Sequence, residues 1–156
     1  MARQWLTACV AVMAASSTAA QAAPDPAFCR VLQDFVRSVR PDEAREITFR
    51  TSWGHGFDGS PDRLAEKACS RHDDEPSIKL CAYLVQHGSA EFTDVTVKHA
   101  LMCLSPKTRF ARDLTLKQGT FSFSVGKPDR GAWVEASFGD DREMGGKVFR
   151  LKAEGY

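Results

Sequence analysis

Apolar side chains recur at helical spacing just after residue 22. Asp25 and Pro26 are residue types that begin a helix, because a carboxylate accepts hydrogen bonds from free backbone N–H groups and proline presets φ. The apolar positions that follow are Phe28, Leu32, Phe35 and Val39. This spacing predicts an N-terminal amphipathic helix that stops at Pro41 and carries Cys29 toward the core.

The apolar period changes to two at Glu46, which predicts a half-buried strand. The side chains expected on its core-facing side are Ile47, Phe49, Thr51 and Trp53. The strand leads into residues 54–59, where three glycines permit backbone angles that are closed to other residues. We expect this loop to display His55, Phe57 and Asp58.

Two further helices are expected at residues 60–71 and 77–88. The first opens on the capping types Ser60, Pro61 and Asp62 and continues through Leu64, Ala65, Ala68 and Cys69. The second is capped by Ser77, closed by Gly88, and has Ile78, Cys81, Ala82 and Val85 on one face. Because only a short polar connector separates them, they are expected to form an antiparallel helical hairpin.

Residues 91–104 fit two interpretations. The β-branched run at Val95, Thr96 and Val97 favours a strand. A helix face is defined instead by Phe92, Val95, His99 and Met102, with Cys103 beside it. The helix is preferred, because Thr93 or Asp94 can begin it and Ser105-Pro106 ends it.

Short alternations of apolar and polar residues after Pro106 predict strands. They occur at Leu114 and Leu116, and then around residues 120–125, 133–138 and 148–153. The links at residues 126–131 and 139–146 are rich in turn formers and short enough for hairpins. Helices first and strands later predict an α+β fold, with the helices packed on a C-terminal antiparallel sheet of about four to five strands.

The first 22 residues have the layout of a secretory signal peptide. Arg3 precedes an apolar run over residues 5–15, and a small-residue site at residues 20–22 places the expected cleavage between Ala22 and Ala23. A lipoprotein box around Cys9 is the alternative, but too few residues precede that cysteine. Residues 23–156 are then expected to form one domain, periplasmic or secreted, with no transmembrane segment.

Four cysteines remain once the leader is removed, and an even number in an exported chain favours two disulfides. The expected helical hairpin brings Cys69 to Cys81, which leaves Cys29 for Cys103. Removal of Arg3 also leaves 20 basic and 20 acidic residues, and this neutrality argues against nucleic acid as a partner.

The candidate functional residues lie on two polar segments and among the aromatic residues. His55 and Asp58 could act as a base and the group that orients it. The acidic connector Asp73, Asp74 and Glu75 lacks calcium-loop spacing, so neither a metal nor a cofactor is expected. Aromatic side chains are typical of protein interfaces, and Trp53, Phe57 and Trp133 are the candidates.

No nucleophile motif or nucleotide-binding glycine loop occurs in the chain, so the sequence favours binding over catalysis. The expected function is a periplasmic protein-binding module. Its most concrete form is an inhibitor or immunity protein that neutralises a cell-envelope-directed toxin or wall hydrolase. The alternatives are a secreted hydrolase that uses His55 with Asp58 or with the Asp73/Asp74 pair, and a structural envelope protein.

Overall fold

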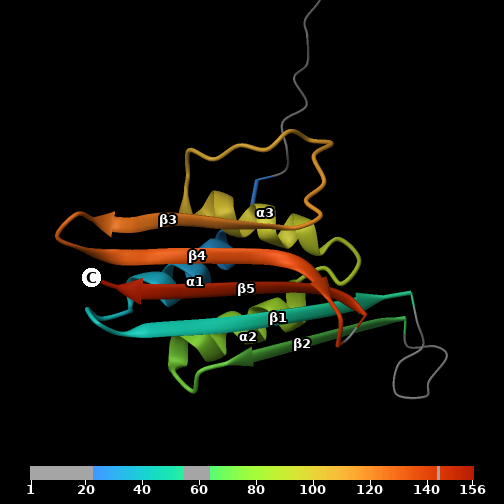
Figure 1. Cartoon of the computed structure of the whole chain (residues 1–156), viewed down its shortest axis with the longest axis horizontal. Helices are drawn as coiled ribbons and strands as arrows, with labels where there is room; N and C mark the ends of the chain where they lie inside the picture. The colour runs from blue at the N-terminus through green and yellow to red at the C-terminus, as the bar shows by residue number, and fades with distance from the viewer. Residues whose placement is uncertain (1–22, 55–63, 144) are drawn as a thin grey trace, which may run out of the picture.

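The computed structural model describes residues 23–54, 64–143 and 145–156, which form an α+β domain with the helices on one face of an antiparallel sheet (Figure 1). The leader expected at residues 1–22 lies outside these residues. The helices are α1 (Pro26–Arg37), α2 (Glu75–His87) and α3 (Thr93–Leu104). The strands are β1 (Ala44–Trp53), β2 (Ala65–Arg71), β3 (Gly119–Lys127), β4 (Arg130–Asp141) and β5 (Gly146–Gly155).

The five strands lie in the order β2-β1-β5-β4-β3, so β2 and β3 form the two edges. Tight hairpin links join β3 to β4 and β4 to β5, and each neighbouring pair is antiparallel. The central pairing is between β1 and β5, with Phe49 opposite Phe149. The sheet therefore places the last strand of the chain between an early strand and its own hairpin partner.

The core lies between the sheet and the helices, because alternate strand residues point to that side. Ile47, Phe49, Phe149 and Leu151 are fully buried there. The helices cover them with a set of buried apolar side chains, which includes Leu32, Phe35, Leu80, Leu84 and Val97. None of the described helices lies on the opposite face of the sheet (Figure 1).

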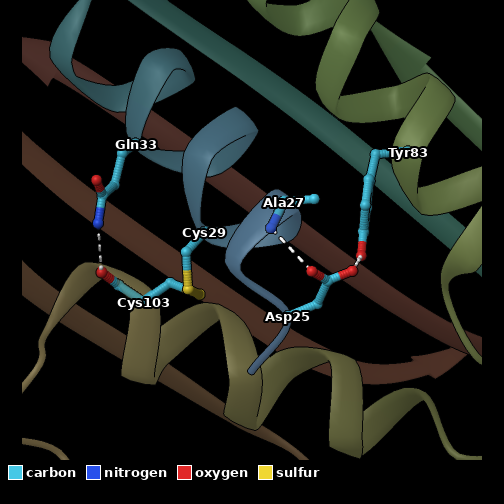
Figure 2. The surroundings of a disulfide bond; sticks show 6 residues. All are labelled: Asp25, Ala27, Cys29, Gln33, Tyr83 and Cys103. Atoms are coloured by element: carbon cyan, nitrogen blue, oxygen red, sulfur yellow. Dashed lines mark hydrogen bonds between the residues drawn. A yellow bond between two sulfur atoms is a disulfide. The ribbon is translucent and has the colours of Figure 1, made fainter. Parts of the chain in front are cut away.

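Both predicted disulfides are confirmed. Cys29 of α1 bonds to Cys103 of α3, and a hydrogen bond of 3.3 Å from the Gln33 amide to the Cys103 carbonyl oxygen lies beside it (Figure 2). Cys69 bonds to Cys81, with their Cα atoms 5.6 Å apart. Two disulfides are typical of proteins that fold in an oxidising compartment, which fits a secreted or periplasmic protein.

The helix predicted at residues 60–71 is wrong for the part that the structure describes. Ala65–Arg71 is the edge strand β2, in which Cys69 stands opposite Phe49 of β1. Cys69 therefore reaches Cys81 from a strand that underlies α2, and no helical hairpin joins the two cysteines. Alanine, glutamate and lysine favour helices, but this preference is small in energy and pairing with β1 overrides it.

Further along the chain one prediction agrees with the structure and one does not. Residues 93–104 form α3, in agreement with the preferred helical interpretation. The short strand expected at Leu114 and Leu116 is wrong, because that segment is irregular. It is held to α3 by Lys98, whose ammonium group donates to the Leu114 carbonyl oxygen at 2.7 Å.

Among the described residues, no helix has both the length and the apolar character that crossing a membrane requires.

Candidate functional site

The glycine-rich loop with His55, Phe57 and Asp58 lies outside the described residues. The candidate pair of base and orienting carboxylate on this loop, and its possible role in binding, therefore stay predictions. The structure describes the positions of the remaining candidates, which are Trp53, Asp73, Asp74, Glu75 and Trp133.

Asp74 is the N-cap of α2. Its carboxylate accepts hydrogen bonds from the Ser77 backbone N–H at 3.1 Å and from the Ser77 hydroxyl at 2.7 Å, and Arg45 lies 3.5 Å away. Burial acts to raise the pKa of Asp74, but the Ser77 hydrogen bonds and the Arg45 charge outweigh it and hold that pKa below its usual value. Asp74 is thus an ionised helix cap, occupied by the backbone that it stabilises.

The other two acids of the connector point elsewhere. The side chain of Asp73 is 97% exposed and lies 3.6 Å from Arg71. Glu75 pairs with Lys79 one turn further along α2, at 2.7 Å. The three carboxylates do not converge, and no group of three or more potential metal ligands occurs among the described residues. The connector therefore lacks the geometry of a cation site.

Both candidate tryptophans are exposed. The expectation that Trp53 faces the core is wrong, because it stands at the end of β1 and is 49% exposed. Trp133 of β4 is 45% exposed and alternates with the buried Ala132 and Val134, so it points to the face without helices. We call this surface the open face. It comprises the side chains of the strands that point away from α1, α2 and α3.

The open face is mainly polar. Its hydroxyl-bearing side chains include Thr48 of β1, Thr120, Ser122 and Ser124 of β3, and Ser137 of β4. In β5, Arg150 lies between the buried Phe149 and Leu151 and stands opposite Thr48 on one side and Ser137 on the other. Arg150 therefore occupies the middle of the open face, and its partner Ser137 lies four residues along β4 from Trp133.

A hollow of about 510 Å³ lies beside Arg150 on the open face. The end of β4 bends across the sheet toward β1 (Figure 1), where Asp141 approaches Arg50 at 3.4 Å. This bend borders the hollow on one side and the start of β3 borders it on the other. The polar side chains around the hollow are Gln118, Thr120, Ser137, Asp140, Arg142 and Arg150.

The two guanidinium groups at the hollow are available to a ligand. Within the described part of the chain, neither Arg142 nor Arg150 forms an ion pair or a side-chain hydrogen bond, and both are exposed. The nearby carboxylate of Asp140 is taken by Lys147, whose hydrogen bond and charge lower the pKa of Asp140. The free charge at the hollow is therefore positive.

This arrangement suits the binding of carboxylates. Arginine presents a planar fork of donors that matches a carboxylate, and hydroxyl groups beside it can add further hydrogen bonds. The hollow is open to solvent and borders the polar side chains of the open face, which fits a protein surface better than a small enclosed substrate.

The hollow was not predicted from the pattern of residues along the chain. Arg150 carried a usable signal, because it is a charged residue between the apolar residues Phe149 and Leu151 of an alternating strand. Arg142 carried none, because residues 139–146 were interpreted as a simple hairpin link. The bend of β4 that brings Arg142 beside Arg150 depends on packing against β1, which no local pattern encodes.

Comparison with family models, with curated proteins and with solved structures finds no match to this chain, so its function has to be inferred from the surface itself.

Proposed function

We propose that this protein is an exported protein-binding module that docks an acidic protein surface on its open face. Its most concrete form is an inhibitor or immunity protein directed at a cell-envelope toxin or a wall hydrolase. The observation that carries the proposal is the pair of exposed guanidinium groups of Arg142 and Arg150 at the hollow, neither of which forms an ion pair with a described residue.

Rigidity supports a docking role. The helices are tied to one another by Cys29–Cys103, and the helical layer is tied to the sheet by Cys69–Cys81. The hollow lies mainly on β4 and β5, each of which is hydrogen-bonded to a strand on both sides. Its other border is the start of β3, which is an edge strand. A surface held in one shape loses little conformational entropy on binding, which favours tight association.

The charge pattern supports an acidic partner. A carboxylate at the hollow would meet two cations that have no described acid of their own, so the partner would not have to displace an existing ion pair. Trp133 adds an exposed indole on the same face, about four strand residues away from Ser137. Tryptophan and arginine are the residue types most often found at the energetic centre of interfaces.

Residues outside the face contribute less to this proposal. Asp73 and Glu75 are solvated, and Asp74 caps α2. Trp53 lies at the C-terminal end of β1, three residues past Arg50, which contacts the bend of β4, and would extend the contact surface. His55, Phe57 and Asp58 stay candidates for the same partner surface, because their loop follows directly from Trp53.

The proposal is tested by affinity capture from envelope and secreted fractions with the purified protein and an Arg150→Glu variant. We expect one stoichiometric protein with the wild type, and binding weakened by about 10-fold or more by the charge reversal. Arg30→Glu is the matched control, because Arg30 is an exposed arginine of α1 on the helical side.

Equal capture by wild type, Arg150→Glu and Arg30→Glu would remove the hollow from the contact surface. Capture of no protein, with retention of glycan fragments or small molecules, would contradict the protein-binding function itself. A His55→Ala variant separates the hydrolase alternative, since loss of an activity without loss of the fold would require that histidine.

A further inference from the structure

The outer edge of β3 has no backbone partner among the described residues. Gly119–Lys127 pairs with β4 along its full length, and β3 makes no backbone hydrogen bond to any other described segment. β3 is the last strand of the sheet on that side (Figure 1). A strand edge of nine residues with free N–H and C=O groups is a template for another strand.

The side chains in the middle of β3 do not block such pairing, and its one charged residue, Lys127, stands at the end of the strand. Residues 120–125 contain no charge, proline or glycine, and they alternate hydroxyl groups with apolar groups. The opposite edge, β2, carries Glu66, Lys67 and Arg71 within seven residues. Charged side chains are the usual protection of an exposed edge, so β2 is protected and β3 is not.

The alternation of β3 is complementary to itself. An antiparallel copy centred on Phe123 places Phe121 opposite Val125 and Ser122 opposite Ser124, so apolar meets apolar and hydroxyl meets hydroxyl on each face. The same register sets Lys127 opposite Gly119. A register centred on Ser122 would oppose Lys117 to Lys127, and like charges directly opposite are unfavourable.

An apolar hollow lies on the helix side of this edge. It measures about 290 Å³ and is lined by Leu101 of α3, by Phe110, and by Phe121 and Phe123 of β3. Phe121 and Phe123 are only half-buried, because both line this hollow. A strand added to β3 in this register would direct its own phenylalanine and valine side chains to the same side as the hollow.

We infer that β3 is a homodimer interface, in which two copies pair antiparallel through their β3 edges about a two-fold axis at Phe123. The interface is isologous, because each copy supplies the same uncharged stretch, residues 119–126, and the same apolar hollow. It leaves both open faces exposed and joins the two sheets into one. This inference does not depend on the proposed function.

The test is the molar mass of the disulfide-intact protein, measured by light scattering over a range of concentrations. We expect a dimer that dissociates on dilution. The Ser122→Lys/Ser124→Lys double variant should be monomeric, because each new lysine stands directly opposite a lysine of the other copy. Ala68→Lys/Ser70→Lys is the matched control, with two exposed open-face positions at the same spacing on the β2 edge, and it should stay dimeric.

A third variant tests the register. Ser122→Lys/Ser124→Glu places each lysine opposite a glutamate when the axis lies at Phe123, so the dimer should persist. Circular dichroism checks that every variant is folded. Two results would overturn the interface: a wild type that is monomeric at all concentrations, or a Ser122→Lys/Ser124→Lys variant that is still a dimer. A monomeric Ser122→Lys/Ser124→Glu variant would overturn the Phe123 register.

The capture experiment gives an independent result. A protein that is monomeric but still captures its partner through Arg150 retains the proposed function and loses only the dimer. A protein that forms the dimer but captures no partner retains the β3 interface and loses the proposed function.

Discussion

The Tyr83 hydroxyl donates a hydrogen bond of 2.6 Å to the carboxylate of Asp25, so α2 is bonded to the residue that caps α1 (Figure 2). The other carboxylate oxygen of Asp25 accepts from the Ala27 backbone N–H at 2.8 Å. One side chain therefore begins α1 and also joins the two helices. The Tyr83 ring stacks on Phe28 with a centroid separation of 5.2 Å, which continues the contact toward the core.

The phenol of Tyr83 should lose its proton at a higher pH than an ordinary tyrosine. Burial, together with the hydrogen bond and negative charge of Asp25, raises the pKa of Tyr83 to about 12. Absorbance titration of the phenolate should show this midpoint. The Tyr83→Phe variant identifies the signal, because Tyr156 is then the one tyrosine left in the chain. Asp25→Asn should lower the Tyr83 midpoint, because the negative charge is gone. A Tyr83 midpoint unaffected by Asp25→Asn would contradict the contact.

The same pair makes stability depend on pH at the acid side. The Tyr83 hydrogen bond, followed by the Ala27 N–H, lowers the pKa of Asp25 below 3.8. A carboxylate whose pKa is lower in the folded state stabilises above the pKa of the unfolded chain, and that stabilisation is lost as pH falls through the folded pKa. The difference in Tm between wild type and Asp25→Asn should be constant near neutrality and shrink below pH 4. A Tm difference that grows as the pH falls would contradict the lowered pKa of Asp25 in the folded state.

Removal of the two disulfides should cost unequal amounts of stability. The bonds span 74 and 12 residues, and chain entropy then assigns about 4.5 kcal/mol to Cys29–Cys103 and about 3 kcal/mol to Cys69–Cys81. Urea unfolding of the paired Cys→Ala variants measures both values. The larger loss is expected for Cys29→Ala/Cys103→Ala. The opposite ranking would show that the short bond stabilises mainly through the native contact of β2 with α2.

The buried pair Asp94–Lys98 should behave unlike the exposed pair of the same spacing. The side chain of Lys98 is 5% exposed and lies 3.1 Å from Asp94. Asp94→Ala leaves a buried ammonium group with the Leu114 carbonyl oxygen alone and should cost about 3 kcal/mol in the free energy of unfolding. Asp94→Ala/Lys98→Met should recover much of this loss, since no buried charge remains.

Glu75→Ala is the control for that prediction. The Glu75–Lys79 pair has the same i,i+4 spacing but is exposed on both sides, so its loss should change stability much less. Equal losses for Asp94→Ala and Glu75→Ala in urea unfolding would mean that burial does not set the strength of these pairs.

The parts of the fold that sequence predicted are those where local pattern and tertiary packing agree. The period-two segments of β1, β4 and β5 have one face in the core, and their alternation is visible in the sequence. The segment at residues 93–104 holds β-branched residues, yet its apolar spacing and its terminating Ser105-Pro106 were sufficient to favour the helix.

The errors have tertiary causes. β2 is an edge strand with helix-favouring residues, and only its pairing with β1 makes it extended. The correct pairing of Cys69 with Cys81 was therefore reached from a wrong secondary structure, because a strand beneath α2 and a helix beside it both bring the sulfur atoms together. Trp53 kept the parity of the buried residues Ile47 and Phe49, but β1 extends past the helices at that end and leaves it uncovered.

The candidate site was predicted only in part. Trp133 could be assigned to the face opposite Val134 from alternation alone. Asp74 was a candidate binding residue, because a sequence does not reveal whether an acid before a helix is used as its cap. The proximity of Arg142 and Arg150 follows from the β4–β5 register and the bend of β4, which are properties of the assembled sheet.

The central position of β5 has a consequence for how the chain acquires its structure. β1 and β4 each pair with Gly146–Gly155 and not with one another, so these earlier strands have no common neighbour until β5 has been synthesised. Pairings between such distant segments form slowly. Folding is thereby delayed until the final strand is present, and a chain interrupted before it would expose the apolar sides of both neighbours to aggregation or proteolysis.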